Sequence, residues 1–366
     1  MSARLRPGGA PDSALAAVRP EIRALAGYAA PALGATKPGV KLDFNESPFD
    51  VPDEVKAVVL ERLAARRWSL YPERRNPRLV AALAAAHGLS DDEVAVGNGS
   101  GELILAAVSV FAGQGGTLLI APPTFSLYKQ MAAICGANLA SVPRRGPDLS
   151  IDEDAFLAGA AARSAIPLVC SPNNPTGGVA PLSFVRRLAA SAPVVLLDQA
   201  YVDFASPEDD ALPLLAELPN LVVFRTLSKA FAAAGFRIGW MAARAEVLEE
   251  IEKAYLPYSV DHASEELALA LHERPEISAR LCALLASERE RLASGLRALG
   301  ITVPISRANF VFFAPPDADG KGLHARLLAR GIAVRELHAT HPGHLRVTVG
   351  SPEQNDLFLS VLKELL

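Results

Sequence analysis

The amino-acid sequence predicts an α/β fold, with a large domain around a mainly parallel sheet and a small α/β domain at the C-terminal end. Through the middle of the chain, short apolar runs alternate with segments of helical length. Strands that are apolar on both faces are typical of a parallel sheet covered by helices on both sides. From about residue 260 the pattern changes. At 366 residues the chain is also long for one hydrophobic core, so its size favours two unequal domains.

Each apolar run in the middle of the chain predicts a strand of the large domain. These runs are EVAVG at 93–97, GTLLIA at 116–121, IPLVCS at 166–171, PVVLLD at 193–198 and LVVFRT at 221–226. The later part reads as a long helical stretch beginning at SEELALA, a strand in ANFVFFAP, a helix in GLHARLLARG, a strand pair in IAVREL and HLRVTVG, and a closing helix. We expect an N-terminal segment over 1–45 that packs with the small domain, a large domain over 46–260 and a small domain over 261–366.

Composition excludes several classes of protein. The formal net charge is -4 and the basic residues are scattered, so no nucleic-acid-binding surface is predicted. Three cysteines lie far apart without C-x-x-C spacing, which predicts neither a disulfide framework nor a metal site and fits a reducing compartment. No apolar run is long enough to span a membrane, and Asp12 and Glu21 argue against an organellar transit segment. A cytoplasmic protein is expected.

Two loops that follow predicted strands carry polar groups suited to a ligand. In open parallel sheets, ligands bind outside the carboxyl ends of the strands. After EVAVG comes NGSGE at 98–102, whose glycines expose backbone N–H groups at a helix start, suited to a phosphate. After IPLVCS comes PNNPTGG at 172–178, a rigid loop that can fix the amide of Asn174. Taken singly, NGSGE is a weak signal that a tight turn before a helix also explains, and a structural turn would be the favoured interpretation of PNNPTGG.

The next two strands deliver a carboxylate, a lysine and an arginine. Asp198 closes the strand PVVLLD, where a protonated ring nitrogen would be a suitable partner, although an isolated aspartate is more often a helix cap. Lys229 lies among small and apolar residues, and a desolvated lysine has a lowered pKa and can react with an aldehyde. Arg237 can grip a phosphate. Alone, Lys229 would be an ordinary surface lysine; the set of groups at one sheet edge predicts a binding site.

At this point the chain resembles the histidinol-phosphate aminotransferase branch of the fold-type I, pyridoxal-phosphate-dependent aminotransferases, over nearly its whole length. The matching pieces, in the family's order, are KLDFNESPFD, SLYPERRNPRLVAALA, VGNGSGELI, PPTFSLY, SPNNPTGG, DQAYVDF, RTLSKAFAAAGFRIGW, SRANFVFF and LRVTVGSPEQND. Any one piece is modest evidence, whereas nine in order are specific. The resemblance implies the fold-type I architecture, with a mainly parallel, seven-stranded sheet between helices in the large domain. It also implies pyridoxal 5'-phosphate as cofactor and no metal.

The resemblance also implies a role for individual residues. Lys229 would hold the cofactor covalently and then move the proton, and Asp198 would pair with the pyridine nitrogen. The other implied cofactor contacts are Asn174 and Tyr201 to the ring 3-oxygen, Phe125 and Ala200 on the two ring faces, and Ser100, Gly101, Thr226, Ser228 and Arg237 to the phosphate. Tyr71 would reach that phosphate from a partner subunit, which implies a homodimer.

The implied substrate-binding residues lie in the N-terminal segment and the small domain. Arg346 would hold the α-carboxylate of glutamate, and Arg335 the substrate phosphate or the distal carboxylate of glutamate. Tyr28 and Asn45 would close over the substrate. For the two arginines the alternative is an ion pair, and for Tyr28 a packing aromatic.

The chain departs from the family pattern at three positions. Gly101 stands where an acidic residue is usual, Gln199 replaces the glutamate of D-E-A-Y, and Phe125 replaces the commoner tyrosine. None of these removes a group essential for transamination. They bear on which substrate is used, because relatives with the same core act on aromatic amino acids or decarboxylate a phosphothreonine.

The function that the resemblance implies is transamination between L-glutamate and imidazole acetol phosphate, giving L-histidinol phosphate and 2-oxoglutarate in histidine biosynthesis. The rival hypotheses within the fold are a broad aromatic aminotransferase and a phosphothreonine decarboxylase. A non-enzymatic nucleotide-binding module would use NGSGE but would leave Lys229, Asp198 and Asn174 without a role.

Overall fold

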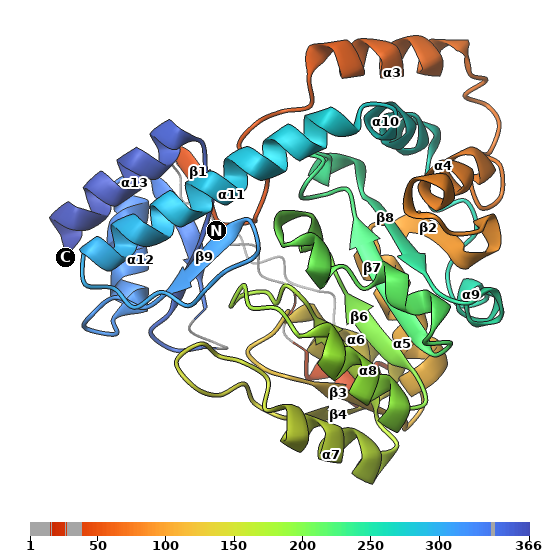
Figure 1. The fold of residues 1–366 in the computed structure, drawn as a ribbon, viewed down its shortest axis with the longest axis horizontal. Coiled ribbons are helices and arrows are strands. Elements are labelled where there is room, and N and C mark those ends of the chain that lie inside the picture. Colours follow the sequence, from red (N-terminus) through yellow and green to blue (C-terminus); the bar gives the residue numbers. More distant parts are fainter. Residues whose placement is uncertain (1–14, 16, 26, 28–38, 338–340) are drawn as a thin grey trace, which may run out of the picture.

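A computed structural model describes residues 15, 17–25, 27, 39–337 and 341–366. Its larger sheet has seven strands in the order β2 (Val94–Asn98), β8 (Ile238–Ala242), β7 (Leu221–Thr226), β6 (Val195–Asp198), β5 (Ile166–Cys170), β3 (Thr117–Ile120) and β4 (Asn138–Ser141) (Figure 1). Neighbouring strands are parallel except β8, which runs antiparallel to both β2 and β7. The predicted mainly parallel, seven-stranded sheet is confirmed, and β4 and β8 are the two strands that the five apolar runs had not located.

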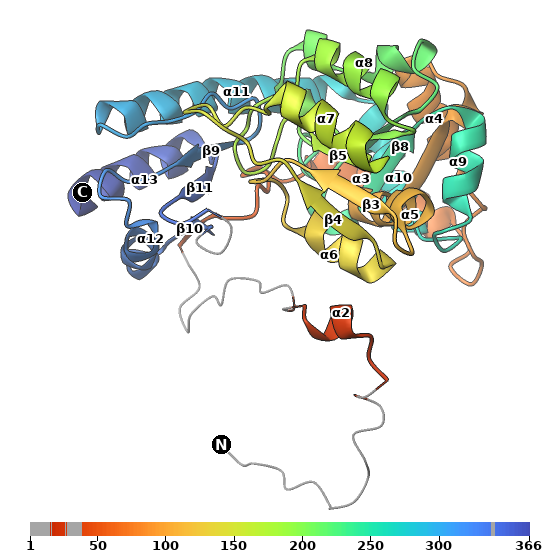
Figure 2. The same ribbon diagram turned by 90° about the horizontal axis from the view of Figure 1, so that it is seen from below.

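Helices cover both faces of this sheet, which explains why its central strands are apolar throughout. One face carries α5 (Ser100–Ala112), α6 (Leu127–Cys135) and α9 (Ala245–Glu252). The other carries α7 (Glu153–Arg163), α8 (Leu182–Ser191), α4 (Pro77–His87) and α10 (His262–His272), with α3 (Asp53–Ala65) packed on α10. Figure 2 shows α7 and α8 on one side of the sheet and α5 and α6 on the other. Burying both faces of the central strands β5, β6, β7 and β8 leaves the strand ends as the place for polar residues.

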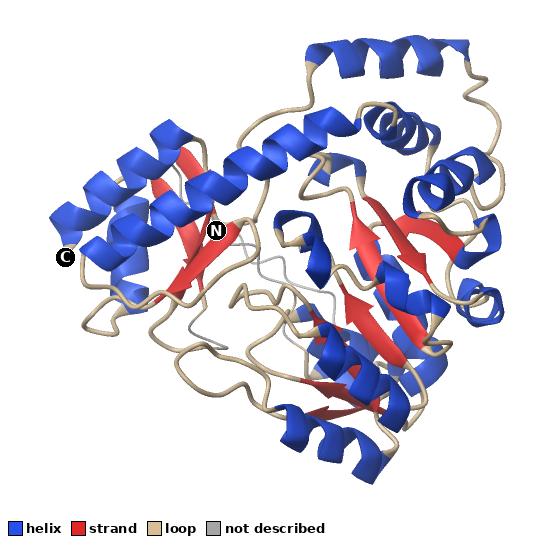
Figure 3. Ribbon diagram, in the orientation of Figure 1, coloured by secondary structure: helices blue, strands red, loops and turns tan. Residues whose placement is uncertain are grey.

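The smaller sheet has four strands in the order β1 (Val40–Leu42), β10 (Ile332–Glu336), β11 (Leu345–Thr348) and β9 (Phe310–Phe313). β1 is parallel to β10, and the other pairs are antiparallel. The helices α11 (Pro275–Ala298), α12 (Gly320–Ala329) and α13 (Pro352–Leu365) complete this domain. The two sheets stand apart as separate units (Figure 3). Pairing with β10 places β1 of the N-terminal segment in the small domain's sheet, whereas Arg19, beside α2 (Pro20–Arg23), donates to the backbone oxygen of Ile134 on α6 of the large domain.

The junction between the domains is formed by α10 and α11. The apolar residues of α10 belong to the core of the large domain, whereas Leu285, Leu292 and Leu296 of α11 belong to the core of the small one. The expected boundary at residue 261 stays a prediction, and this packing favours a boundary after α10.

The remaining elements are short. They are α2 (Pro20–Arg23) and the 3₁₀ turns η1 (Asp91–Glu93), η2 (Val202–Phe204), η3 (Pro207–Asp209), η4 (Leu212–Ala216) and η5 (Ala234–Phe236). Over the described part of the chain, no helix is both long and apolar enough to cross a membrane. All three cysteines are free.

Candidate active site

The strand register brings the predicted site residues to one edge of the large sheet. Cys170 pairs with Asp198 across β5 and β6, and Asp198 with Phe224 across β6 and β7. The loops that carry Asn174 and Lys229 therefore leave the sheet beside Asp198. On the other side, Asn98 at the end of β2 pairs with Ile238 at the start of antiparallel β8. The turn that carries Arg237 consequently lies beside the start of α5.

Lys229 occupies a desolvated position at this edge. Its Nζ donates a hydrogen bond to the backbone oxygen of Phe44 at 3.1 Å and lies 5.9 Å from the ring centroid of Tyr201. Burial, with the positive charge of Arg346 as a second cause, lowers the pKa of Lys229 to about 7. Near neutral pH much of the lysine is thus a neutral amine, which is the form that attacks an aldehyde and accepts a proton.

Asp198 is buried and held by two donors. The hydroxyl of Tyr128 donates to Oδ2 at 2.5 Å, and the backbone N–H of Ala200 donates to Oδ1 at 3.0 Å. Burial raises the pKa of Asp198, whereas these two hydrogen bonds oppose the rise. A positively charged partner would favour the ionised carboxylate further, so the position suits a protonated ring nitrogen.

Asn174 and Asn45 converge on the hydroxyl of Tyr201. The Nδ2 of Asn45 lies 2.9 Å from this hydroxyl and the Nδ2 of Asn174 lies 3.4 Å from it. Arg346 donates to Oδ1 of Asn174 at 2.6 Å. Because arginine has only donors, this contact fixes which side of the Asn174 amide is oxygen and directs its N–H groups toward Tyr201. Burial raises the pKa of Tyr201 to about 12, so its hydroxyl remains protonated and able to donate.

The start of α5 and the Arg237 turn together form a group of donors. The helix begins after Gly99 without a side-chain cap, so its first N–H groups are open to a ligand. Arg237 donates to Oγ of Ser228 at 3.4 Å, and the N–H of Ser228 donates to Oγ1 of Thr226 at 3.1 Å. Among the described residues no carboxylate forms an ion pair with Arg237. Cationic and N–H donors without an acidic partner suit a phosphate.

Two glycines make this close approach feasible. A Cβ atom on Gly99 would lie 2.5 Å from Nη2 of Arg237, and a Cβ on Gly239 would lie 2.1 Å from the backbone nitrogen of Ser100. Gly99 also has φ +80°, which favours glycine. Arg237 itself adopts φ 54°. A left-handed conformation at a residue other than glycine is a strain that often accompanies functional sites.

The structure places the two predicted substrate arginines side by side. Arg335 of β10 lies directly opposite Arg346 of β11, so both side chains are on the same face of the sheet. Arg346 also donates to the backbone oxygen of Asp43 at 2.6 Å, and Arg335 lies 5.8 Å from the ring centroid of Phe44. Like charges directly opposite one another destabilise a strand pair. Their presence here favours a ligand that carries more than one negative charge.

The remaining predicted site residues have more varied positions. Phe125 lies in the loop after β3, in edge-to-face contact with Tyr128, and Ala200 follows Asp198. Gly101 is in the first turn of α5. Tyr71 is in a loop after α3, with 81% of its surface exposed, and stacks on Tyr258 with 5.2 Å between ring centroids. Tyr28 lies outside the described residues.

The geometry explains two of the three departures from the family pattern. The side-chain amide of Gln199 is turned to the chain beyond β6, donating to the oxygen of Asp209 at 2.8 Å and accepting from the N–H of Ala211 at 3.2 Å. It therefore supports the loop after β6. A Cβ on Gly101 would meet only the methyl carbon of Met131, at 3.9 Å. The absent acidic side chain leaves space and removes negative charge beside the donor group.

Tyr128 is a site residue that sequence reasoning missed. It is fully buried on α6, and burial, together with the charge of Asp198, raises the pKa of its hydroxyl well above the ordinary value. Within the motif PPTFSLY, the resemblance implies a role for Phe125 alone. A buried tyrosine hydroxyl requires a partner, and this requirement is the signal that could have drawn attention to it.

These residues fit the expected cofactor. An amine with a lowered pKa, a buried carboxylate, a hydroxyl with oriented amides and a donor-only anion site lie on adjacent strand ends. They match the aldehyde, ring nitrogen, 3-oxygen and phosphate of pyridoxal phosphate, respectively.

Comparison with known proteins gives consistent results. Residues 37–362 match the family model described as aminotransferase class I and II. A histidinol-phosphate aminotransferase from Chlorobium phaeovibrioides is 35% identical over 94% of this chain and 96% of its own. One from Thermococcus kodakarensis is 38% identical over 88% and 91%. The fold is similar, with TM-score 0.86 and 23% identity over 96% and 98% of the chains, to a crystal structure of histidinol-phosphate aminotransferase from Sinorhizobium meliloti in complex with pyridoxal-5'-phosphate.

Proposed function

The chain belongs to the histidinol-phosphate aminotransferases, within the class I and II aminotransferase family, and we propose that it transfers an amino group between L-glutamate and imidazole acetol phosphate. The products are L-histidinol phosphate and 2-oxoglutarate, in histidine biosynthesis. The observation that carries this proposal is the lowered pKa of Lys229. This lysine lies at the same sheet edge as the buried carboxylate of Asp198 and the phosphate-binding donors around Arg237, which forms no ion pair among the described residues.

We assign the cofactor pyridoxal 5'-phosphate to the large-domain edge. When bound, it supplies an aldehyde that takes up the amino group and a ring that accepts the electron pair of the broken Cα–H bond. Asp198 would hold the ring nitrogen, Asn174 and Tyr201 the 3-oxygen, and Phe125 and Ala200 the ring faces. The phosphate would be held by Ser100, Gly101, Thr226, Ser228 and Arg237.

Lys229 carries out the proton transfer. Its neutral Nζ accepts the proton from the substrate Cα and returns it to the carbon that becomes the new C–H centre, acting as base and then acid. The pKa of about 7 leaves the amine able to do both near neutral pH. The hydrogen bond to the backbone of Phe44 holds Nζ on the side of the small domain, toward the predicted substrate position.

The paired arginines account for the choice of substrates. Both glutamate and the phosphorylated imidazole substrate are polyanions, and Arg335 and Arg346 lie on one face of the small sheet. Arg346 would bind the α-carboxylate, with Asn174 keeping its guanidinium in place. Arg335 would bind either the distal carboxylate or the phosphate. Asn45, and Tyr28 of the N-terminal segment, would close over the substrate.

We further propose a cytoplasmic homodimer in which Tyr71 contributes to the phosphate site of the partner subunit. The high exposure of Tyr71 and of neighbouring apolar side chains supports a second copy at this surface. The exposed fractions are 78% for Trp68, 54% for Leu70 and 76% for Leu256. Exposed apolar surface of this kind marks interaction sites.

The decisive experiment is the visible absorption spectrum of the purified holoenzyme before and after L-histidinol phosphate is added. We expect a yellow band that is lost with histidinol phosphate and also with glutamate. A band that responds only to glutamate or aromatic amino acids would leave an aminotransferase of another specificity. Release of carbon dioxide from phosphothreonine would identify a decarboxylase instead, and a protein that stays colourless with pyridoxal phosphate would overturn the enzymatic function.

A further inference from the structure

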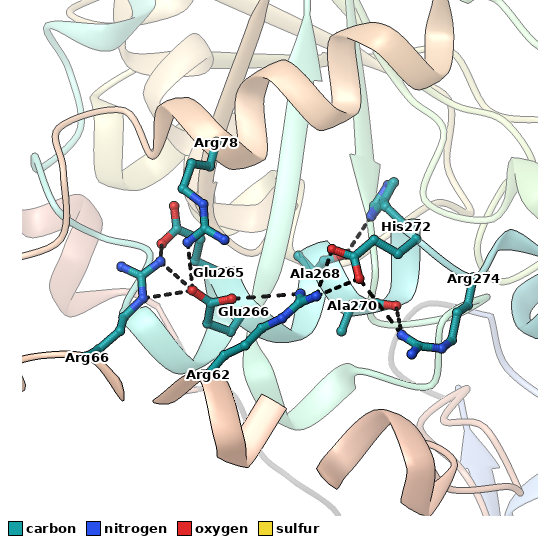
Figure 4. Close-up of polar contacts among 10 residues, drawn as sticks. Arg62, Arg66, Arg78, Glu265, Glu266, Ala268, Ala270, His272 and Arg274 are labelled. Atoms are coloured by element: carbon teal, nitrogen blue, oxygen red, sulfur yellow. Dashed lines mark hydrogen bonds and ion pairs between the residues drawn. The ribbon is translucent and has the colours of Figure 1, made fainter. Parts of the chain in front are cut away.

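The loop that carries Tyr71 is held by a cluster of charged side chains around two buried glutamates. The cluster consists of Arg66 at the end of α3, Arg78 of α4, and His262, Glu265 and Glu266 of α10, and is here called the Arg66 cluster. Figure 4 shows its arginines and glutamates facing one another between the three helices. The glutamate side chains are only 4% and 2% exposed.

Arg66 contacts three side chains of α10. Its Nε donates to Oε1 of Glu266 at 2.7 Å, and its Nη2 to Oε2 of Glu265 at 2.6 Å. Its Nη1 lies 2.9 Å from Nδ1 of His262. Because arginine only donates, Nδ1 of His262 must accept, and the ring proton is on Nε2. That nitrogen lies 3.2 Å from the backbone oxygen of Leu70 and donates to it. The cluster is thereby bonded to the backbone next to Tyr71.

Tyr71 is supported from the other side by Tyr258. The two rings are stacked at 5.2 Å with an interplanar angle of 24°. Tyr258 adopts φ 65°, a left-handed conformation that is costly for a bulky residue. Because one of these two aromatic residues has a strained backbone, we infer that the fold actively keeps Tyr71 and Tyr258 stacked.

The segment that holds Tyr71 is also bonded to the anion site of its own subunit. The amide of Asn98, one residue before Gly99, donates to the backbone oxygen of Ser259 at 3.2 Å. The hydroxyl of Ser264 donates to the backbone oxygen of Phe236, one residue before Arg237, at 2.7 Å. Residues 258–264 thus connect the Tyr71 loop with both loops that would bind the phosphate.

We propose that Tyr258 and the Arg66 cluster position Tyr71, holding its loop in the orientation that completes a phosphate site across the dimer. This inference rests on the proposed function of Tyr71. Tyr258, His262 and Arg66 are positioning residues: they touch no ligand and act through Tyr71. By contrast, Arg62 donates to Glu273 at 2.7 Å and 3.0 Å near the other end of α10, and it reaches the cluster through an ion pair with Glu266 at 3.9 Å. No hydrogen bond in the described residues joins Arg62 to the Tyr71 loop.

The test is a double-mutant cycle on pyridoxal phosphate affinity, measured by absorbance titration of the full-length protein after removal of its cofactor. Tyr71→Phe removes a hydrogen bond to a charged group and should weaken binding about 10-fold. Tyr258→Leu and His262→Ala should each weaken it several-fold in the wild-type background and by less than about twofold in the Tyr71→Phe background.

Conservative variants and an alternative ligand separate positioning from general damage. Tyr258→Phe keeps the stacked ring, and His262→Gln can still accept from Arg66 and donate to Leu70, so both should restore affinity. Arg62→Gln is the matched control, because it removes the ion pairs with Glu273 and Glu266 but leaves the bonds from Arg66 and His262 to the Tyr71 loop, and it should have no effect. Pyridoxal, which lacks the phosphate, should bind all variants alike.

Full additivity in the cycle, or equal losses for pyridoxal, would overturn the positioning role while leaving transamination intact. If Tyr71→Phe binds pyridoxal phosphate like the wild type, the role of Tyr71 fails and the positioning role fails with it. The change in the absorption spectrum on adding histidinol phosphate would still test the enzymatic function independently.

Discussion

Two charged regions of this molecule differ in how their charges are matched. At the α3–α10 interface, Arg66, Arg78 and Arg62 face Glu265, Glu266 and Glu273. At the edge of the large sheet, within the described residues, neither Lys229 nor Arg237 forms an ion pair with a carboxylate. The first region pairs its cations with carboxylates of the same chain, whereas the second leaves cations open for a ligand.

The pKa directions express the same difference. At the interface, burial alone would raise the pKa of Glu266, yet hydrogen bonds from Arg78 and Arg66 lower it below its ordinary value. At the sheet edge, burial and a second cation both lower the pKa of Lys229. A matched cluster therefore stabilises the fold, and an unmatched one stores unfavourable free energy that ligand binding can release.

The largest effect should come from the unmatched lysine. Lys229→Ala should reduce turnover by about 10⁴-fold, because it removes the proton-transferring group, and should abolish the yellow band of the holoenzyme. Steady-state kinetics and absorption spectra check this. Lys56→Ala, at an exposed ion pair with Asp50, is the control and should keep both properties. Full turnover in Lys229→Ala would refute the assignment.

Removing a carboxylate from the α3–α10 interface should lower the free energy of unfolding. Glu266→Leu leaves Arg78 and part of Arg66 unpaired and should lower the free energy of unfolding by about 2 to 3 kcal/mol. The loss is below the upper range for buried pairs because the Arg78 side chain is 53% exposed. Urea unfolding measures it. Glu273→Leu, whose carboxylate is 49% exposed, should cost under about 1 kcal/mol. Equal costs would erase the distinction between buried and exposed partners.

Replacing Arg237 should reduce cofactor affinity and leave the free energy of unfolding unchanged. Arg237→Leu should weaken pyridoxal phosphate binding by about 10- to 100-fold, because a charge-assisted contact is lost. The cofactor-free variant should unfold at a urea concentration no lower than the wild type, since no ion pair is broken. Arg187→Leu, at an exposed ion pair with Glu153 and Asp154, is the control for affinity. A marked loss of stability in Arg237→Leu would show that this arginine is structural.

The smallest effect concerns pH. The pKa of Lys229 is about 7 in the folded cofactor-free protein, against an ordinary value of 10.5. Between these values the unfolded chain binds more protons, so stability should rise as pH increases above 7. Between about pH 6 and about pH 9 the wild type should gain about 1 to 2 kcal/mol relative to Lys229→Met, discounted for partial exposure. Parallel pH profiles of the two proteins would contradict the lowered pKa.

The sequence by itself determined the strand-end part of the site. Apolar runs of strand length locate the sheet, and whatever follows each strand must lie at its carboxyl edge. Asn174, Asp198, Lys229 and Arg237 could therefore be predicted as neighbours from the sequence, and the strand register places their loops side by side. The local pattern of apolar residues shows which segments are buried strands and where each strand ends. In a parallel sheet this information is sufficient to predict which loops lie at the same edge.

Only the tertiary structure decided which distant side chains meet. Arg66 and Glu266 are 200 positions apart, and nothing local in either helix specifies the other. In the same way, the packing of α6 brings Tyr128 to Asp198, and strand pairing in the small domain sets Arg335 opposite Arg346. Contacts of this kind depend on how whole helices and strands pack against one another. The local sequence pattern of one element does not specify which other element it packs against.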